Sequence, residues 1–171
     1  MSKINELTKP LPDSEIEFRI GATSYPKGFQ ILAYKTARTD VRRLNDVFGL
    51  NWECNYFYDT KNNLCCTIRI YDTETKQWIE RTNVGTESMS DGVKGSYSDA
   101  MKRAGFSWGI GVELYDFPFV WINTTESDWV NRKGKNYPKA RVQGWTLSGD
   151  SILNENGKSM YEWPYKNGKI N

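Results

Sequence analysis

The sequence contains two short glycine motifs that resemble phosphate-binding sites. Gly157-Lys158-Ser159 copies the end of a P-loop, but the position where that pattern needs its first glycine is occupied by Ile152. Gly109-Ile110-Gly111 resembles part of a dinucleotide fingerprint, which follows a strand, whereas this motif follows a predicted helix. Neither motif therefore predicts a nucleotide cofactor, and the second is better explained as the end of that helix.

A carboxylate and lysine set indicates a different chemistry. Asp13, Glu74 and Lys76 resemble the acidic pair and lysine with which metal-dependent nucleases hold Mg²⁺ and activate a water. Glu74 and Lys76 belong to a predicted turn and Asp13 lies near the N-terminus, so solvated charges explain them more simply. A metal-dependent nuclease stays an alternative function, which Mg²⁺-dependent degradation of DNA would reveal.

Histidine is absent, which excludes Ser-His-Asp and Cys-His catalysis and histidine-zinc sites. The three cysteines are Cys54, Cys65 and Cys66, and neighbouring residues of a strand point to opposite faces of the sheet. A zinc site would also need an acidic fourth ligand, so these thiols are better explained as small buried hydrophobic groups. We expect no metal site, no cofactor, no catalytic residue and no enzyme activity.

Basic and aromatic residues are the remaining candidates for function. Lys and Arg number 23 against 21 Asp and Glu, so the net charge of +2 indicates no particular partner. Aromatic residues make up 14% of the chain and can either fill a core or stack on unpaired bases. The stretch from Trp129 to Gly149 has no acidic residue and contains Arg132, Lys133, Lys135, Lys139 and Arg141. Such clusters favour either a nucleic-acid surface or an ordinary solvated face.

Apolar spacing predicts the first elements that position these residues. Two β-prone runs, Phe18–Ala22 and Phe29–Tyr34, flank a Pro/Gly turn and predict a hairpin. The helical stripe that follows, with Gly49 at its C-terminal cap, consists of Ala37, Val41, Leu44 and Phe48. Alternating residues then predict three antiparallel strands within 52–58, 64–70 and 77–84, with Arg69 and Arg81 on the face opposite the apolar one.

A second, longer helix carries the best periodic signal in the chain. Its apolar stripe consists of Val93, Tyr97, Met101, Ala104 and Trp108. Lys94 and Lys102 lie on a separate stripe, and Arg103 is offset from Lys102 by about 100°. Gly95 and Gly105 each cost about 1 kcal/mol relative to alanine in a helix, so something other than helix propensity favours glycine there.

These elements predict an α+β fold: a β-hairpin, a helix, a three-stranded antiparallel β-meander and a long helix packed on the sheet. We expect residues 1–12 to be a flexible arm and residues 13–122 to form the core domain. Residues 123–149 are a basic and aromatic segment, and residues 150–171 a weakly ordered extension. No long apolar run and no apolar N-terminal segment occur, so we expect neither a membrane partner nor a secretory signal.

Three segments together carry a family resemblance, namely Phe18–Ser24, Ala33–Gly49 and Ser98–Gly111. Their order and spacing resemble those of the Rad fifty-two–type single-strand annealing proteins, including the DdrA-like and phage Sak-like branches. The resemblance covers roughly residues 13 to 121. It implies a β-β-β-α core and an oligomeric ring or helix in which single-stranded DNA lies in a basic groove.

The resemblance also implies which side chains contact DNA. The matching positions are Arg19 on the first strand, Tyr34 before the first long helix, and the pair Lys102 and Arg103 on the second helix. A further family arginine falls at Phe106, where base stacking can replace one phosphate contact. The basic residues near these positions complete the candidate set, namely Lys35, Arg38 and Lys94.

The function that follows from the resemblance is ATP-independent binding and annealing of single-stranded DNA in homologous recombination and DNA repair, in a phage or bacterium. The expected partners are single-stranded DNA, further copies of the chain, and a single-strand-binding protein or recombinase. The expected location is the cytoplasm or nucleoid of the bacterial host. Besides the nuclease, the alternative is a single-stranded nucleic-acid coating protein that does not anneal, which mixing complementary oligonucleotides would distinguish.

Overall fold

The computed structural model describes residues 3–86, 92–162, 165–166 and 169–170. The chain folds as two compact units, each containing two segments of the chain. Unit 1 comprises residues 1–11 and 35–115, and unit 2 comprises residues 12–34 and 116–171. This corrects the expectation of one core domain over 13–122, because the N-terminal hairpin folds with the last third of the chain. Among the described residues no helix is both long and apolar enough to cross a membrane.

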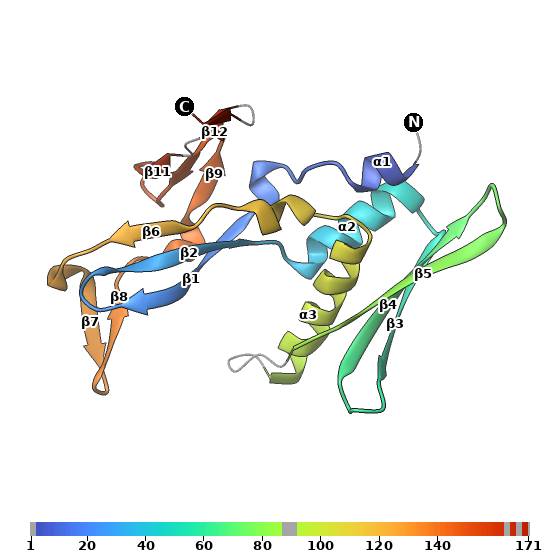
Figure 1. Ribbon diagram of the computed structural model, residues 1–171, viewed down its shortest axis with the longest axis horizontal. Coiled ribbons are helices and arrows are strands. Elements are labelled where there is room, and N and C mark those ends of the chain that lie inside the picture. Colours follow the sequence, from blue (N-terminus) through green and yellow to red (C-terminus); the bar gives the residue numbers. More distant parts are fainter. Residues whose placement is uncertain (1–2, 87–91, 163–164, 167–168, 171) are drawn as a thin grey trace. The chain divides into compact units, whose positions relative to one another are not determined.

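Unit 1 is a three-stranded antiparallel sheet with helices packed beside it (Figure 1). Its helices are α1 (Lys3–Leu7), α2 (Ala37–Phe48) and α3 (Gly92–Ser107), followed by the short 3₁₀ helix η2 (Val112–Asp116). Its sheet has the order β3-β4-β5, with β3 (Trp52–Tyr58), β4 (Leu64–Asp72) and β5 (Gln77–Val84). The predicted helix 37–48, the meander and the long helix are confirmed, and Gly49 ends α2 with a φ of 59°, which favours glycine.

The core of unit 1 lies between α3 and one face of this sheet. Cys66, Ile68 and Ile70 alternate along β4 and are buried, as are Met101 and Ala104 of the predicted helical stripe. The indole N–H of Trp108 donates to the carbonyl of Ile68 at 3.1 Å, which anchors the end of the helix on the central strand. Tyr97, at the outer end of the stripe, is partly exposed, and the side chain of Val93 lies outside the described residues.

The predicted positions of two arginines on the sheet are only half right. Arg69 pairs with Glu80 in the β4–β5 register, on the face away from α3. Arg81 instead pairs with Ile68, and its guanidinium lies 5.0 Å from the ring centroid of Trp108. The error came from assuming a simple register, because the turn after Asp72 sets which residues of β5 face the helix.

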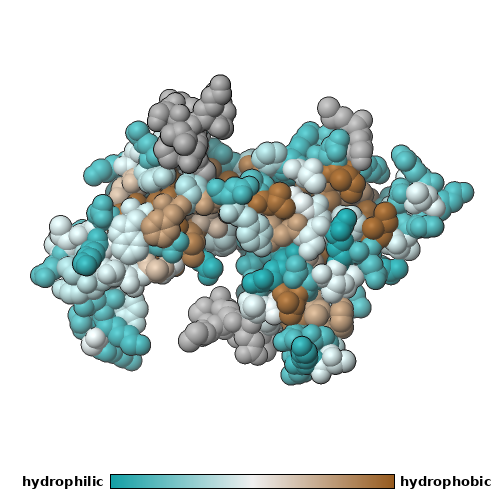
Figure 2. Space-filling view, viewed as in Figure 1, coloured by the Kyte–Doolittle hydropathy of each residue, from teal (hydrophilic) through white to brown (hydrophobic). Residues whose placement is uncertain are grey.

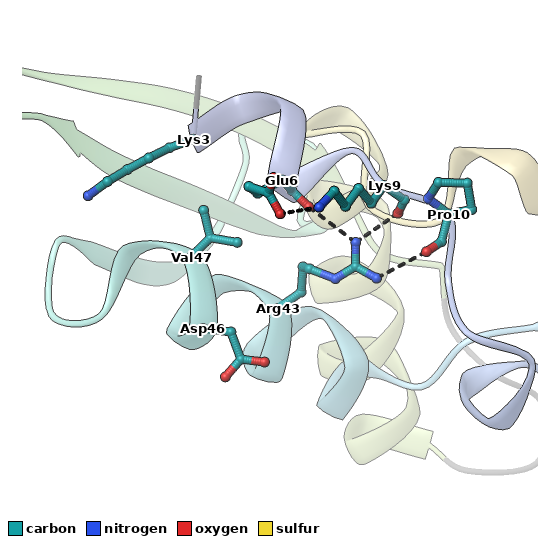
Figure 3. Close-up of a pocket in the computed structure, with 7 residues that line it drawn as sticks. All are labelled: Lys3, Glu6, Lys9, Pro10, Arg43, Asp46 and Val47. Atoms are coloured by element: carbon teal, nitrogen blue, oxygen red, sulfur yellow. Dashed lines mark hydrogen bonds and ion pairs between the residues drawn. The ribbon is translucent and has the colours of Figure 1, made fainter. Parts of the chain in front are cut away.

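The N-terminal segment is packed against α2, which corrects the expected flexible arm. Leu7 and Leu11 are buried, and α1 lies along α2. Arg43 of α2 donates from Nη1 to the carbonyl of Lys9 at 2.7 Å and to those of Glu6 and Leu7 at 3.4 Å, as Figure 3 shows for the residues drawn. A guanidinium thus satisfies carbonyls at the end of α1 that lack helical partners.

Unit 2 is built on a three-stranded sheet of order β1-β2-β6. Its first strands, β1 (Glu17–Ser24) and β2 (Gly28–Tyr34), form the predicted hairpin after the 3₁₀ turn η1 (Asp13–Glu15). β6 (Val120–Asn123) pairs antiparallel with β2, and this pairing across about ninety residues explains why the hairpin belongs to unit 2. The remaining elements are η3 (Glu126–Asp128), β7 (Trp129–Arg132), β8 (Lys135–Pro138), η4 (Val142–Gly144), β9 (Thr146–Ser148), β10 (Ser151–Leu153), β11 (Ser159–Glu162), β12 (Tyr165–Lys166) and β13 (Lys169–Ile170).

One apolar cluster holds unit 2 together. Its buried members are Phe18, Phe29, Ile31, Val120, Ile122, Val142, Trp145 and Ile152. Ile152 lies on β10, the central strand of the sheet β11-β10-β9. The segment expected to be a weakly ordered extension therefore forms strands as far as Glu162, and β10 contributes Ile152 to the core. The apolar residues of this segment are sparse, and they become part of a core because Ile152 joins the cluster while Met160 and Tyr161 pack against it.

Candidate nucleic-acid interface

The seven residues expected to contact DNA divide between the two units. Arg19 and Tyr34 belong to unit 2. The others belong to unit 1, namely Lys35, Arg38, Lys94, Lys102 and Arg103.

In unit 2, Arg19 and Tyr34 lie on the same face of the β1-β2-β6 sheet. Arg19 pairs with Leu32, and Tyr34 pairs with Glu17, two residues before Arg19. Phe18, Phe29 and Ile31 alternate with these residues and point into the core. The face that carries Arg19 is therefore the face opposite the core.

The Tyr34 phenol is held by a carboxylate on this face. Its O–H donates to Glu17 Oε2 at 2.7 Å. Partial burial, followed by the hydrogen bond and charge of Glu17, raises the pKa of Tyr34 to about 12. Tyr34 is consequently a neutral, half-buried ring whose hydroxyl is already bonded, so it can offer a ligand its aromatic surface.

Two aromatic side chains that sequence reasoning missed lie on the same face. Trp121 pairs with Gln30 in the β2–β6 register, which places it on the side of Arg19. Phe119 stacks on Trp121 with ring centroids 6.2 Å apart and planes 10° from parallel, and 69% of Phe119 is exposed. The available signal was the run Phe119–Ile122, which is rich in β-prone residues but short. Together these residues are called the open face: Arg19, Tyr34, Phe119 and Trp121.

In unit 1, Lys102 and Arg103 share one carboxylate. Arg103 Nε donates to Asp99 Oδ2 at 2.8 Å, and Lys102 Nζ lies 3.7 Å from Asp99 Oδ1. Although burial opposes its ionisation, hydrogen bonds from Thr86 and Arg103 hold the pKa of Asp99 below its ordinary value. Two cations with a single counter-charge leave a net positive charge, and the side chains of Lys102 and Arg103 are 26% and 39% exposed. Both can therefore reach a phosphate.

Lys35 does not fit the expected role, and this corrects its assignment to the DNA-contacting set. Its side chain is wholly buried and forms an ion pair with Asp40 of α2, which is also buried. Its ammonium group lies 4.1 Å from the ring centroid of Phe106 in α3. A cation in this position joins two helices and has no access to a phosphate.

The environment of this ion pair shifts both groups toward their neutral forms. Burial lowers the pKa of Lys35 and raises the pKa of Asp40 to about 6. Among the described residues, Asp40 Oδ2 finds no hydrogen-bond partner. A Cβ at Gly105 would overlap the Asp40 carboxylate, so the close approach of this side chain to α3 explains the glycine.

Phe106 occupies the position where the family resemblance places an arginine. Its ring covers Lys35 and packs against Tyr115 at a centroid distance of 4.7 Å. The half-buried ring of Phe106 thus already has two partners inside unit 1, and its stacking on a base stays a prediction. Arg38 and Lys94 are exposed and remain candidates.

The residues considered for metal chemistry belong to different units. Asp13 Oδ2 in unit 2 accepts a hydrogen bond from the Gly149 amide at 2.9 Å, whereas Glu74 belongs to the β4–β5 turn of unit 1. The described residues contain no group of three or more histidine, cysteine, aspartate or glutamate side chains that could hold a metal ion. Cys65 and Cys66 are buried, and the Cys66 thiol lies 3.9 Å from the sulfur of Met101.

Comparison with protein-family models gives one match, to the Rad52/22 family double-strand break repair protein, over residues 3–129. No curated protein and no solved structure matches the chain. The matched segment covers most of unit 1 and the whole open face of unit 2. It agrees with the resemblance seen in the sequence, and it connects the chain with DNA recombination and repair. The chain therefore belongs to the Rad52/22 family of double-strand break repair proteins.

Proposed function

We propose that this protein binds single-stranded DNA and anneals complementary strands. The observation that carries the proposal is the open face, where an exposed phenylalanine stacked on a half-buried tryptophan lies on the same side of a sheet as an exposed arginine and a neutral tyrosine. Aromatic faces stack on unpaired bases with little regard to sequence, and arginine neutralises phosphates. Duplex DNA hides its bases, so this combination favours single strands.

Annealing then needs no covalent chemistry. Two complementary strands repel each other through their phosphates and must find their register. A protein that neutralises the backbone lowers the repulsion between the strands, and one that holds bases on an open surface shortens the search for register. Base pairing itself recognises the sequence. Lys102, Arg103, Arg38 and Lys94 of unit 1 supply further positive charge, so we assign them to backbone contacts.

The finer points of the proposal rest on the family resemblance. They are a ring or helical assembly of copies, a relationship to the DdrA-like or phage Sak-like branch, and a role in phage or bacterial recombination. A single-strand-binding protein or a recombinase is the expected protein partner, and the bacterial cytoplasm or nucleoid the expected place of action.

The test is strand annealing followed by fluorescence energy transfer between two complementary labelled oligonucleotides, in EDTA and without nucleotide. The protein should accelerate annealing, and Phe119→Ala should slow it. Phe57→Ala is the matched control, because Phe57 is an exposed phenylalanine on β3 of unit 1, outside the open face. Binding without acceleration would identify a coating protein, and DNA degradation that appears only with Mg²⁺ would identify a nuclease. Either result would overturn the proposal.

A further inference from the structure

The hairpin formed by β7 and β8 lies almost entirely beyond the segment matched by the family, which ends at Trp129. Its two strands pair from Trp129 with Pro138 to Arg132 with Lys135. Lys133 and Gly134 form its tight turn with φ values of 53° and 78°. Trp129 is buried, so packing explains an aromatic residue at that position. Packing does not explain the positively charged residues that follow it.

Most cations of this hairpin and of the segment after it form no ion pair within the described part of the chain. Arg132, Lys133, Lys135 and Arg141 are exposed, and their side chains make no ion pair or hydrogen bond within the described part of the chain. Lys139 Nζ donates to the carbonyl of Ser127 at 2.8 Å, and its charge, after the hydrogen bonds from Thr125, helps to lower the pKa of Asp128. By contrast, Lys9, Lys35, Arg69, Lys102 and Arg103 are each paired with a carboxylate. The visible surface over β7 and β8 is accordingly mostly hydrophilic (Figure 2).

A groove of about 580 Å³ runs beside these cations within unit 2. Arg132, Lys139 and Arg141 contribute the basic part of its lining. The apolar part comes from Ile20 of β1, Val130 and Pro138. Tyr137 also lines the groove, and 46% of its surface is exposed. The volume is in the range of pockets that hold small organic ligands, about 300–1,000 Å³.

The combination of an apolar floor, an exposed phenol ring and a basic rim selects a ligand that is both planar and anionic. A nucleotide has these two properties, with a base that stacks on Tyr137 and phosphates that meet the arginines. A duplex offers the phosphates but keeps its bases stacked inside, so the apolar floor would be left unused. An acidic peptide would satisfy the charges without using the aromatic ring.

We propose that this groove and the β7–β8 hairpin form an additional binding site for single-stranded nucleic acid, separate from the open face. The phosphate backbone follows Arg132, Lys135 and Arg141, and an unpaired base lies against Tyr137. The proposal rests on the proposed function in taking nucleic acid as the ligand, and its tests separate the two.

The first test is fluorescence anisotropy of a labelled oligothymidylate with the full chain, titrated with salt. The variant combines Arg132→Gln, Lys135→Gln and Arg141→Gln. The control combines Lys61→Gln, Lys76→Gln and Lys158→Gln, which removes the same charge from exposed turns elsewhere. The hairpin variant should lose at least about tenfold in affinity at low salt, and its slope of log K against log salt should become about 2 units shallower, at ~0.7 per lost phosphate contact. The control should change neither value by a comparable amount, and both variants should melt like the wild type.

The second test locates the base. Photocrosslinking of an oligonucleotide that contains 5-iodouracil, followed by mass spectrometry, should give a crosslinked peptide that includes Tyr137, and Tyr137→Phe should retain it because the ring still stacks. Crosslinks confined to the open face would overturn the groove site.

The outcomes distinguish this site from the proposed function. If the wild type binds the oligonucleotide and the hairpin variant binds it equally well, the groove proposal is wrong while single-strand binding stands. If the hairpin variant loses affinity only for a duplex, or if polyglutamate competes as well as DNA, the single-strand assignment is wrong. If the wild type does not bind oligothymidylate at all, both proposals fail.

Discussion

A single carboxylate, Asp99, organises the two basic residues that the sequence singled out most clearly. It pairs with both Lys102 and Arg103, and it also accepts hydrogen bonds from the amide and hydroxyl of Thr86. The arginine side chain is thereby held at a defined position on α3 before any ligand arrives. Pre-organisation of this kind reduces the conformational entropy lost when a phosphate binds.

We expect the double substitution Lys102→Ala and Arg103→Ala to weaken DNA binding without unfolding the protein. The neighbours Met101 and Ala104 anchor α3 by their burial, and alanine is a good helix former. The salt slope of log K should become shallower by about 1.4 units, at ~0.7 for each lost contact with a single strand. Anisotropy across a salt series measures this, and a circular dichroism melt checks folding. A folded double variant that binds like the wild type would show that these residues are only a solvated helix face.

Tyr34 tests stacking separately from charge. Tyr34→Ala should cost about 1–3 kcal/mol of binding free energy with little change in salt slope, because a base loses its aromatic partner and no cation is removed. Tyr34→Phe loses only the hydrogen bond to Glu17 and should bind nearly as tightly as the wild type. Equal losses for the two variants, measured by the same titration, would mean that the hydroxyl and not the ring matters.

At the scale of elements, the contact between α2 and α3 depends on a glycine. Gly105→Ala should destabilise the protein by about 1–3 kcal/mol, since the new methyl group overlaps the buried Asp40 carboxylate. Helix propensity alone gives the opposite sign, a gain of about 1 kcal/mol. Urea unfolding of the wild type and of Gly105→Ala shows whether the free energy of unfolding falls or rises. In an Asp40→Ala background the cost of Gly105→Ala should shrink, and a cost that stays the same would place the strain elsewhere.

The same contact should make stability depend on pH. Burial raises the pKa of Asp40 to about 6 from its ordinary value of 3.8. Between these values the folded protein binds a proton that the unfolded chain does not, so the free energy of unfolding falls as pH rises through this window. Relative to Asp40→Asn, which cannot titrate, the wild type should lose up to about 3 kcal/mol between pH 4 and pH 7. Urea unfolding of both proteins measures this, and a gain with rising pH would show that the ion pair with Lys35 dominates.

At the scale of the whole molecule, we expect the protein to assemble. Three strands spaced about 4.8 Å apart give the open face a width of only ~10–15 Å, which is short for holding two strands in register. Several copies side by side would extend it. Light scattering coupled to size exclusion, with and without an oligonucleotide, should give masses that are multiples of the 19.8 kDa chain. A strict monomer that still accelerates annealing would rule out this explanation.

Local patterns determined much of the architecture. The hairpin 17–34, the helix α2 with its glycine cap, the meander and α3 were all predicted, because each depends on periodicity or turn chemistry within some twenty residues. Arg19, Tyr34, Lys102 and Arg103 were selected from a resemblance in short segments. Where the pattern was weak, the sequence predicted a flexible arm over residues 1–12 and a weakly ordered extension over residues 150–171, but Leu7 and Ile152 in these segments are buried.

Tertiary structure decided which of these residues share a surface. The pairing of β2 with β6 brings Trp121 beside the strand of Tyr34, and no local signal contains a contact between segments so far apart. It also decided that Lys35 is buried while Arg38, three residues later, is exposed, because α3 covers only one side of α2. The sequence by itself therefore determined the helices and strands from the first hairpin to α3 and the family resemblance, but not the short strands that follow. Burial and long-range pairing, which depend on what each element packs against, determined the binding surfaces.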